Sequence, residues 1–103
     1  MTPDARLILL HPDDNVFVCC ASIAAGEIIL IEGQDIRVNE DIAVGHKVAR
    51  CRLEIGAKVL KYGAPIGSIT VGVNPGEHVH LHNLASDYLP VGPVNPRGGG
   101  VKR

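Results

Sequence analysis

A β-hairpin pattern fills the stretch Lys58-Val59-Leu60-Lys61-Tyr62-Gly63-Ala64-Pro65-Ile66-Gly67-Ser68-Ile69-Thr70-Val71, where Gly63-Ala64-Pro65 separates two apolar runs of strand length. Six further runs alternate with Gly, Pro, Asn and Asp, and none has the length or period of a helix. We therefore predict an all-β fold of short strands and hairpins, with little or no helix. The expected strands are Leu7–Leu10, Val16–Ala21, Ile28–Ile31, Ile36–Val38, His46–Leu53, Lys58–Tyr62, Ile66–Val71 and His78–His82, with a turn at Pro12-Asp13-Asp14-Asn15.

An internal repeat of the form aliphatic-x-x-Gly-x-x-aliphatic occurs four times, around Gly26, Gly45, Gly56 and Gly76. Glycine adopts a positive φ angle at little cost, so each copy predicts a turn that leads into a strand. Gly26 precedes Gly56 by 30 residues, and Gly45 precedes Gly76 by 31. This spacing predicts two related halves of one folded-over β structure.

The 103-residue composition predicts one small domain with an aliphatic core, because the chain has no Trp and three aromatic residues. A net charge of −1 and the scarcity of aromatic side chains disfavour nucleic acid as a partner. The apolar run Leu7–Leu10 is too short for a secretory signal or a membrane span, so we expect a cytoplasmic protein. We expect a domain over residues 1–90, a flexible Gly/Pro-rich tail over residues 91–103, and three buried free thiols.

Three of the five histidines stand at every second position in Gly76-Glu77-His78-Val79-His80-Leu81-His82-Asn83. In a strand these imidazoles would share one face at a spacing of about 7 Å, while Val79 and Leu81 would enter the core. Two such rings can bind one metal ion, but a complete site needs His46 or residues of another chain. The run therefore predicts a shared metal site or a histidine surface that faces a substrate.

Other chemically active side chains lie beside the predicted turns. His46 and Lys47 follow the Gly45 turn, and Lys61 and Tyr62 precede Gly63. Strand ends beside turns can present groups to a ligand without disturbing the core. The alternative interpretation is an exposed His46-Lys47 pair, and a surface Lys61 whose stem packs on the Tyr62 ring.

Several of these segments resemble, in the same order, the small N-terminal module of the altronate and galactarate dehydratase family. The likeness covers about residues 5–90. This module is similar to SAF domains, so the resemblance implies the β-clip fold, and it also occurs as a separate small subunit in sulfolactate sulfo-lyase. The segments that carry it are His11-Pro12-Asp13-Asp14-Asn15-Val16, Gly45-His46-Lys47-Val48-Ala49, Lys61-Tyr62-Gly63-Ala64-Pro65-Ile66-Gly67, Val79-His80-Leu81-His82-Asn83-Leu84 and Ser86-Asp87-Tyr88-Leu89-Pro90.

The resemblance implies a small lyase subunit of sugar-acid catabolism that is inactive alone. It would eliminate water or sulfite from a hydroxy acid, either a sugar acid or a sulfolactate-like substrate, in a site completed by a large dehydratase subunit. It also implies a divalent metal (Fe, Mn, Mg or Zn) shared with that subunit, and a homo-oligomer is possible. The implied roles are catalysis for His46, His80 and His82, metal binding for His80 and His82, and substrate binding for Lys47, Lys61, Tyr62 and Asn83.

Two other functions stay open from the sequence. One is a non-catalytic SAF-type module that binds a carbohydrate or a protein. The other is a histidine-rich metal-binding protein that performs no chemistry.

Overall fold

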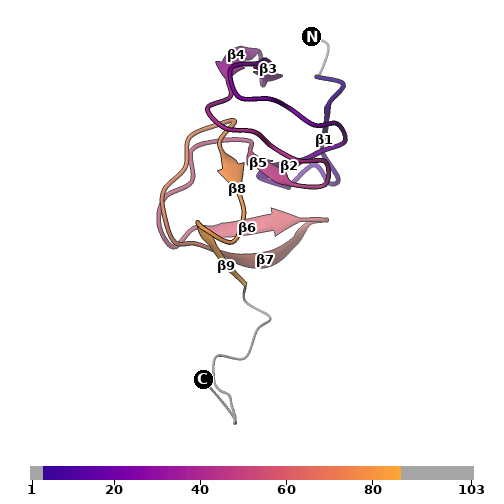
Figure 1. The fold of residues 1–103 in the computed structure, drawn as a ribbon. Coiled ribbons are helices and arrows are strands. Elements are labelled where there is room, and N and C mark those ends of the chain that lie inside the picture. Colours follow the sequence, from indigo (N-terminus) through magenta and orange to yellow (C-terminus); the bar gives the residue numbers. More distant parts are fainter. Residues whose placement is uncertain (1–3, 87–103) are drawn as a thin grey trace.

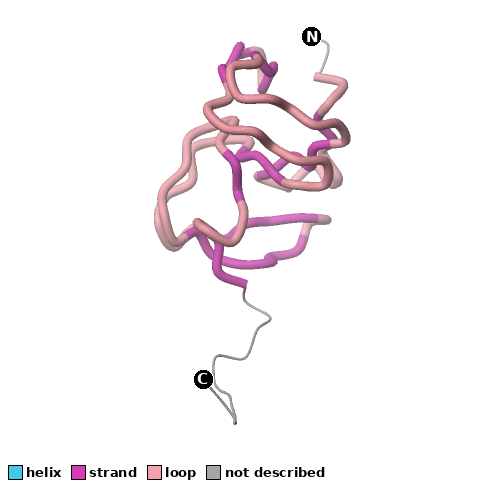
Figure 2. The backbone as a smooth tube through the Cα atoms, viewed as in Figure 1, coloured by secondary structure: helices cyan, strands magenta, loops and turns pink. Residues whose placement is uncertain are grey.

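A computed structural model describes residues 4–86 of the chain, and this range contains no helix (Figure 2). The all-β prediction is confirmed. Since the described residues hold no helix at all, none of them forms a helix that could cross a membrane. The strands are β1 (Leu7–Ile8), β2 (Val16–Cys19), β3 (Ile28–Ile31), β4 (Gln34–Arg37), β5 (Lys47–Ala49), β6 (Lys58–Lys61), β7 (Ala64–Ile69), β8 (His78–Val79) and β9 (Leu84–Ser86).

The strands form three antiparallel sheets that follow one another along the molecule (Figure 1). A four-stranded sheet, β1-β2-β5-β8, lies between the β3–β4 hairpin and the three-stranded sheet β6-β7-β9. The buried hydrophobic side chains form two clusters. The first contains Leu7, Cys19, Ile23, Ile29, Ile31, Val38, Ile42 and Val48, and the second Val16, Ala49, Leu53, Val59, Ile69, Val73 and Val79.

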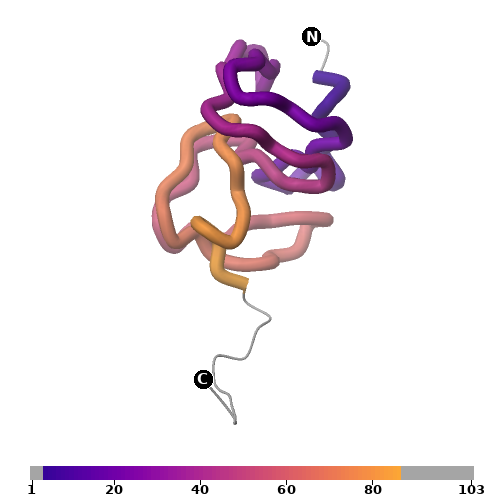
Figure 3. The backbone as a smooth tube through the Cα atoms, viewed as in Figure 1, coloured from indigo at the N-terminus to yellow at the C-terminus, as the bar shows by residue number. Residues whose placement is uncertain are grey.

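The four glycine turns have the predicted backbone conformation, because Gly26, Gly45, Gly56 and Gly76 have φ angles of 93°, 87°, 90° and 85°. The two halves also contain equivalent contacts. An isolated bridge pairs two aliphatic residues in each half, Ile23 with Ile42 and Leu53 with Val73. The structure therefore supports the predicted repeat, with one hairpin in each half (Figure 3). Each hairpin contributes its buried residues to one of the two apolar clusters.

Each half also contains a two-residue hairpin turn with two positive φ angles, Glu32-Gly33 and Tyr62-Gly63. Two consecutive positive φ angles are the signature of a type I′ turn, whose twist matches that of the flanking strands. The second turn thus begins one residue earlier than the sequence predicts, and Pro65 already belongs to β7.

The segment before each hairpin holds that hairpin in place. Asp4 accepts the N–H of Leu30 at 3.0 Å, and Arg6 donates to the carbonyl of Ile28 at 2.7 Å. Asn15 does both for the second hairpin, because its amide accepts one N–H and donates to one carbonyl of β6, each at 2.8 Å.

Most strands are shorter than predicted. The expected strand His46–Leu53 is reduced to Lys47–Ala49, and β9 was not predicted. Of the cysteines, Cys19 is buried as expected, whereas Cys20 and Cys51 are exposed. Adjacent residues of a strand end point to opposite sides, which explains the difference between Cys19 and Cys20. The expected domain limit at residue 90 and the tail 91–103 lie outside the described residues.

Candidate functional site

Four of the five histidines form one cluster around the His78 ring, which we call the histidine cluster. The His46 and His80 rings stack with their centroids 4.2 Å apart. The His78 centroid lies 5.0 Å from that of His46, 5.4 Å from that of His80 and 5.3 Å from that of His82. Stacking of this kind places several imidazole nitrogens around a small volume.

Strand pairing brings the two parts of the cluster together from positions far apart in the sequence. His46 immediately precedes β5, and His78 opens β8. These strands are antiparallel neighbours, with Val48 opposite His78 and Lys47 opposite Val79. The buried Val48 and Val79 anchor both strands in the apolar clusters, so the His46 and His78 backbones are held on a rigid support.

The predicted strand His78–His82 is wrong beyond Val79, because the chain turns at residues 80–83. The buried Asn83 side chain stabilises this turn: its oxygen accepts the His80 N–H at 2.9 Å, and its nitrogen donates to the His78 carbonyl at 2.7 Å. The predicted core position of Leu81 is also wrong, because 82% of this residue is exposed. The turn nevertheless places the His80 and His82 rings next to the His78 ring. The three rings therefore cluster without a continuous strand.

A chain of hydrogen bonds links a carboxylate to two of the rings. Glu40 Oε1 lies 3.1 Å from His78 Nδ1, and His78 Nε2 lies 2.8 Å from His46 Nδ1. The His78 side chain is 10% exposed and the Glu40 side chain 50% exposed. Both ring nitrogens of His78 therefore have protein partners, whereas within residues 4–86 no ring nitrogen of His80 or His82 forms a hydrogen bond.

The two predicted lysines interact electrostatically with each other, and Lys47 also acts on the histidine cluster. Burial lowers the pKa of Lys47, and the positive charge of Lys61 lowers it further. Burial also lowers the pKa of His80, with additional contributions from the other three rings of the cluster and from Lys47. His80 is consequently a neutral imidazole at neutral pH, and it lies within the electrostatic reach of Lys47.

The remaining predicted binding residues have different surroundings. Tyr62 is 68% exposed, and the Lys61 ammonium lies 5.8 Å from its ring centroid, which places Tyr62 beside Lys61. Asn83 is buried with its amide bonded to the backbone of the histidine turn. Their roles in substrate binding stay predictions.

Two sets of side chains in the described range could each hold a metal ion: His46, His78 and His80, or Glu40, His78 and His82. The ligand atoms of each set lie within 4.8 Å of one another. Neutral imidazoles suit Zn²⁺, Fe²⁺ and similar ions, and two histidines with one carboxylate suit Fe²⁺. The donor chemistry therefore fits a divalent metal, although His80 and His82, the predicted pair, belong to different sets.

Two clefts adjoin the cluster, and His78 contributes to both. One has a volume of about 450 Å³ and includes His46, and the other has a volume of about 270 Å³ and includes Glu40 and His82. These volumes are at the lower end of those that enclose a small molecule. The histidine cluster thus lies between two hollows that a further chain could deepen.

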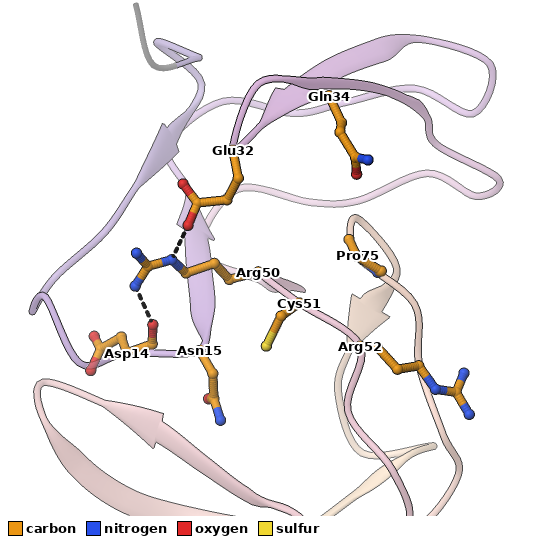
Figure 4. Close-up of a pocket in the computed structure, with 8 residues that line it drawn as sticks. All are labelled: Asp14, Asn15, Glu32, Gln34, Arg50, Cys51, Arg52 and Pro75. Atoms are coloured by element: carbon orange, nitrogen blue, oxygen red, sulfur yellow. Dashed lines mark hydrogen bonds and ion pairs between the residues drawn. The ribbon is translucent and has the colours of Figure 1, made fainter. Parts of the chain in front are cut away.

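A separate cleft of about 460 Å³ contains neither His nor Lys (Figure 4). Its central side chain, Arg50, pairs with Glu32 at 2.7 Å and donates to the carbonyls of Pro12 and Asp14. These contacts connect the two halves of the molecule and engage the Nε and Nη1 groups of the guanidinium. We therefore interpret this cleft as structural.

Sequence reasoning missed two members of the site. The alternating run includes His78 and the resemblance implies no role for it, yet the structure places this ring at the centre of the cluster. No sequence pattern indicates Glu40, which lies 38 residues before His78 in an irregular segment. Its position follows from the pairing of the two halves, which no local pattern reveals.

Comparison with known proteins identifies the family to which the sequence is similar. Residues 5–87 match the family model described as altronate/galactarate dehydratase SAF domain. The chain is 41% identical over 82 residues to an altronate dehydratase of Escherichia coli (strain K12). This shared region covers 80% of this chain and 17% of that protein. The chain is 38% identical over 84 residues to an altronate dehydratase of Bacillus subtilis (strain 168), again covering 17% of that protein.

A third similar protein is a much shorter chain. The (2R)-sulfolactate sulfo-lyase subunit alpha of Chromohalobacter salexigens is 34% identical over 84 residues, covering 74% of this chain and 89% of that subunit. The chain therefore spans about a sixth of the altronate dehydratases and nearly the full length of the sulfo-lyase subunit.

Proposed function

Because this chain belongs to the altronate/galactarate dehydratase SAF domain family, we propose that it is the small subunit of a lyase that eliminates water or sulfite from a hydroxy acid. Its similarity to nearly all of a sulfo-lyase alpha subunit supports an independent small subunit. The altronate dehydratases are about six times longer than the region they share with it, which supports a large partner that completes the site.

The observation that carries this proposal is the gathering of four imidazoles in the histidine cluster, with Lys47 within electrostatic range of His80. Lys47 and Lys61 interact electrostatically, Lys47 also acts on His80, and His80 stacks on His46. Ammonium groups bind a carboxylate, and neutral imidazoles exchange protons near neutral pH. Elimination from a hydroxy acid needs both kinds of group, one to bind the carboxylate and one to transfer protons.

The reaction requires three things of the protein. A base accepts the proton from the carbon beside the carboxylate, and the bond from the next carbon to its oxygen or sulfur then breaks. When the leaving group is a hydroxyl, it takes up a proton and departs as water, and the resulting enol rearranges to a 2-oxo acid. Negative charge on the carboxylate side must be stabilised throughout.

We assign these tasks to the predicted residues. His46 transfers a proton, and Lys47 and Lys61 bind the carboxylate. His80 and His82, whose ring nitrogens have no hydrogen-bond partner within residues 4–86, line the pocket and offer ligands to a divalent metal (Fe, Mn, Mg or Zn) completed by the large subunit. When bound, such an ion supplies Lewis-acid stabilisation of the developing negative charge. Tyr62 contributes a hydrogen bond from the rim of the site.

A domain exchange tests the proposal. The matched segment of the E. coli altronate dehydratase is replaced by residues 5–87 of this chain, and the 2-oxo acid formed from altronate is measured with semicarbazide. The E. coli enzyme without the segment is the control. We expect the exchange protein to dehydrate altronate and the control to be inactive. An exchange protein that assembles like the parent enzyme and forms no product would contradict the proposal.

A further inference from the structure

We propose that Glu40 is a positioning residue that fixes the tautomer of His78 and, through it, the tautomer of His46. The catalytic importance of this inference rests on the proposed function, in which the tautomer determines which nitrogen of His46 can accept a proton. Its structural content stands on the two hydrogen bonds of the cluster alone.

The direction of each bond follows from the donor and acceptor capacities of the groups. An ionised carboxylate only accepts, so the bond between Glu40 Oε1 and His78 Nδ1 requires the hydrogen on Nδ1. A neutral imidazole carries one hydrogen, so His78 Nε2 has a lone pair and accepts from its neighbour. The neighbour is His46 Nδ1 at 2.8 Å, which must therefore be the donor.

The same reasoning leaves His46 with a defined free nitrogen. With its hydrogen on Nδ1, the neutral His46 ring has its lone pair on Nε2. A general base needs such a lone pair, and a carboxylate commonly selects the tautomer of a catalytic histidine. Here the Glu40 carboxylate acts on His46 indirectly, through the His78 ring that lies between them.

The surroundings favour a fixed arrangement over a fluctuating one. The His78 side chain is 10% exposed, and its backbone belongs to β8 beside the buried Val79. The His46 ring is additionally held by stacking on His80. Glu40 is half exposed, so its replacement removes a hydrogen-bond acceptor without opening a cavity in the core.

The test reads the tautomers directly in the full 103-residue chain. Protein labelled with ¹⁵N at histidine is freed of metal with EDTA, and long-range ¹H–¹⁵N correlation spectra distinguish protonated from unprotonated ring nitrogens. The spectra are recorded at mildly alkaline pH. Assignments come from the His46→Gln and His78→Gln variants.

In the wild-type chain we expect the Nδ1–H form for both His78 and His46. In Glu40→Ala, His78 should revert to the Nε2–H form that the neutral histidine side chain prefers in water. Its Nε2–H then donates to His46 Nδ1, so the His46 hydrogen moves to Nε2. Glu54→Ala, which removes an exposed carboxylate paired with Arg52, is the matched control and should leave both rings unchanged.

A wild-type spectrum with the Nε2–H form of His46 would overturn the inference, as would tautomers that are the same in Glu40→Ala and wild type. Backbone amide spectra establish that each variant is folded. Because this measurement needs no partner or substrate, its failure is distinct from failure of the lyase proposal. If both proposals hold, Glu40→Ala in the exchange protein should lower kcat by at least about 10-fold with little change in KM.

Discussion

The Asp4 carboxylate should stabilise the first hairpin in a strongly pH-dependent way. Its side chain is 8% exposed and accepts hydrogen bonds from the Arg6 guanidinium at 2.9 and 3.0 Å and from the Leu30 N–H at 3.0 Å. The hydrogen bond from Arg6 is the main reason that the Asp4 pKa is lowered from 3.8 to about 2, against the opposing effect of burial. At about 1.4 kcal/mol per pKa unit, this difference corresponds to about 2 kcal/mol of folding free energy.

The sign follows from the lowered pKa in the folded state. The unfolded chain binds the proton more readily, so this stabilisation is complete above the ordinary pKa of 3.8 and is lost as the pH falls toward about 2. Asp4→Asn should therefore lose about 2 kcal/mol at pH 7 and show less further loss in acid. Urea unfolding followed by circular dichroism at several pH values measures both effects.

Asp35→Asn is the matched control, because Asp35 is an exposed carboxylate on a strand of the same hairpin. It should retain the acid-dependent loss of stability seen in the wild type. If Asp4→Asn and wild type lost stability in parallel as the pH falls from 5 to 2, the assignment of this energy to Asp4 would be refuted.

Three further predictions concern the turns and the site. Gly26→Ala should lower the free energy of unfolding in urea by about 1 kcal/mol, and Gly76→Ala should lower it by more. Both glycines have a positive φ, but a Cβ at Gly76 would lie 2.7 Å from Ile36 Cγ2, whereas a Cβ at Gly26 would meet nothing within 4 Å. Equal losses in the two variants would contradict this prediction. Asn83→Ala should cost about 1–3 kcal/mol in the same assay, because it leaves an N–H and a carbonyl of the histidine turn unpaired, and a neutral effect would refute that role. Lys47→Met in the exchange protein should raise KM for altronate by about 10-fold or more, while an unchanged KM would exclude carboxylate binding there.

The sequence allowed good prediction of features that depend on local conformation. The four glycine turns follow from the tolerance of glycine for positive φ, and their 30- and 31-residue spacing indicated the two halves. The absence of helical periodicity likewise predicted the β class. These features need no knowledge of which residues meet in space.

Features set by tertiary contacts were predicted less well. The strand His78–His82 had the alternation of a half-buried strand, but the Asn83 side chain competes for the backbone bonds of residues 78 and 80 and produces a turn. Leu81 consequently points outward, and Glu40 enters the cluster from an irregular segment. Pattern analysis identified the imidazoles as a group, but it could not identify His78 as their centre.

The most direct test of the central claim compares two histidine variants in the exchange protein. His46→Gln removes the proposed proton-transfer group, and His11→Gln changes the one histidine outside the cluster. The account predicts that His46→Gln lowers kcat for altronate by about 10²-fold or more, while His11→Gln has nearly the parent activity. Equal activity of the two variants would contradict a catalytic contribution from this surface.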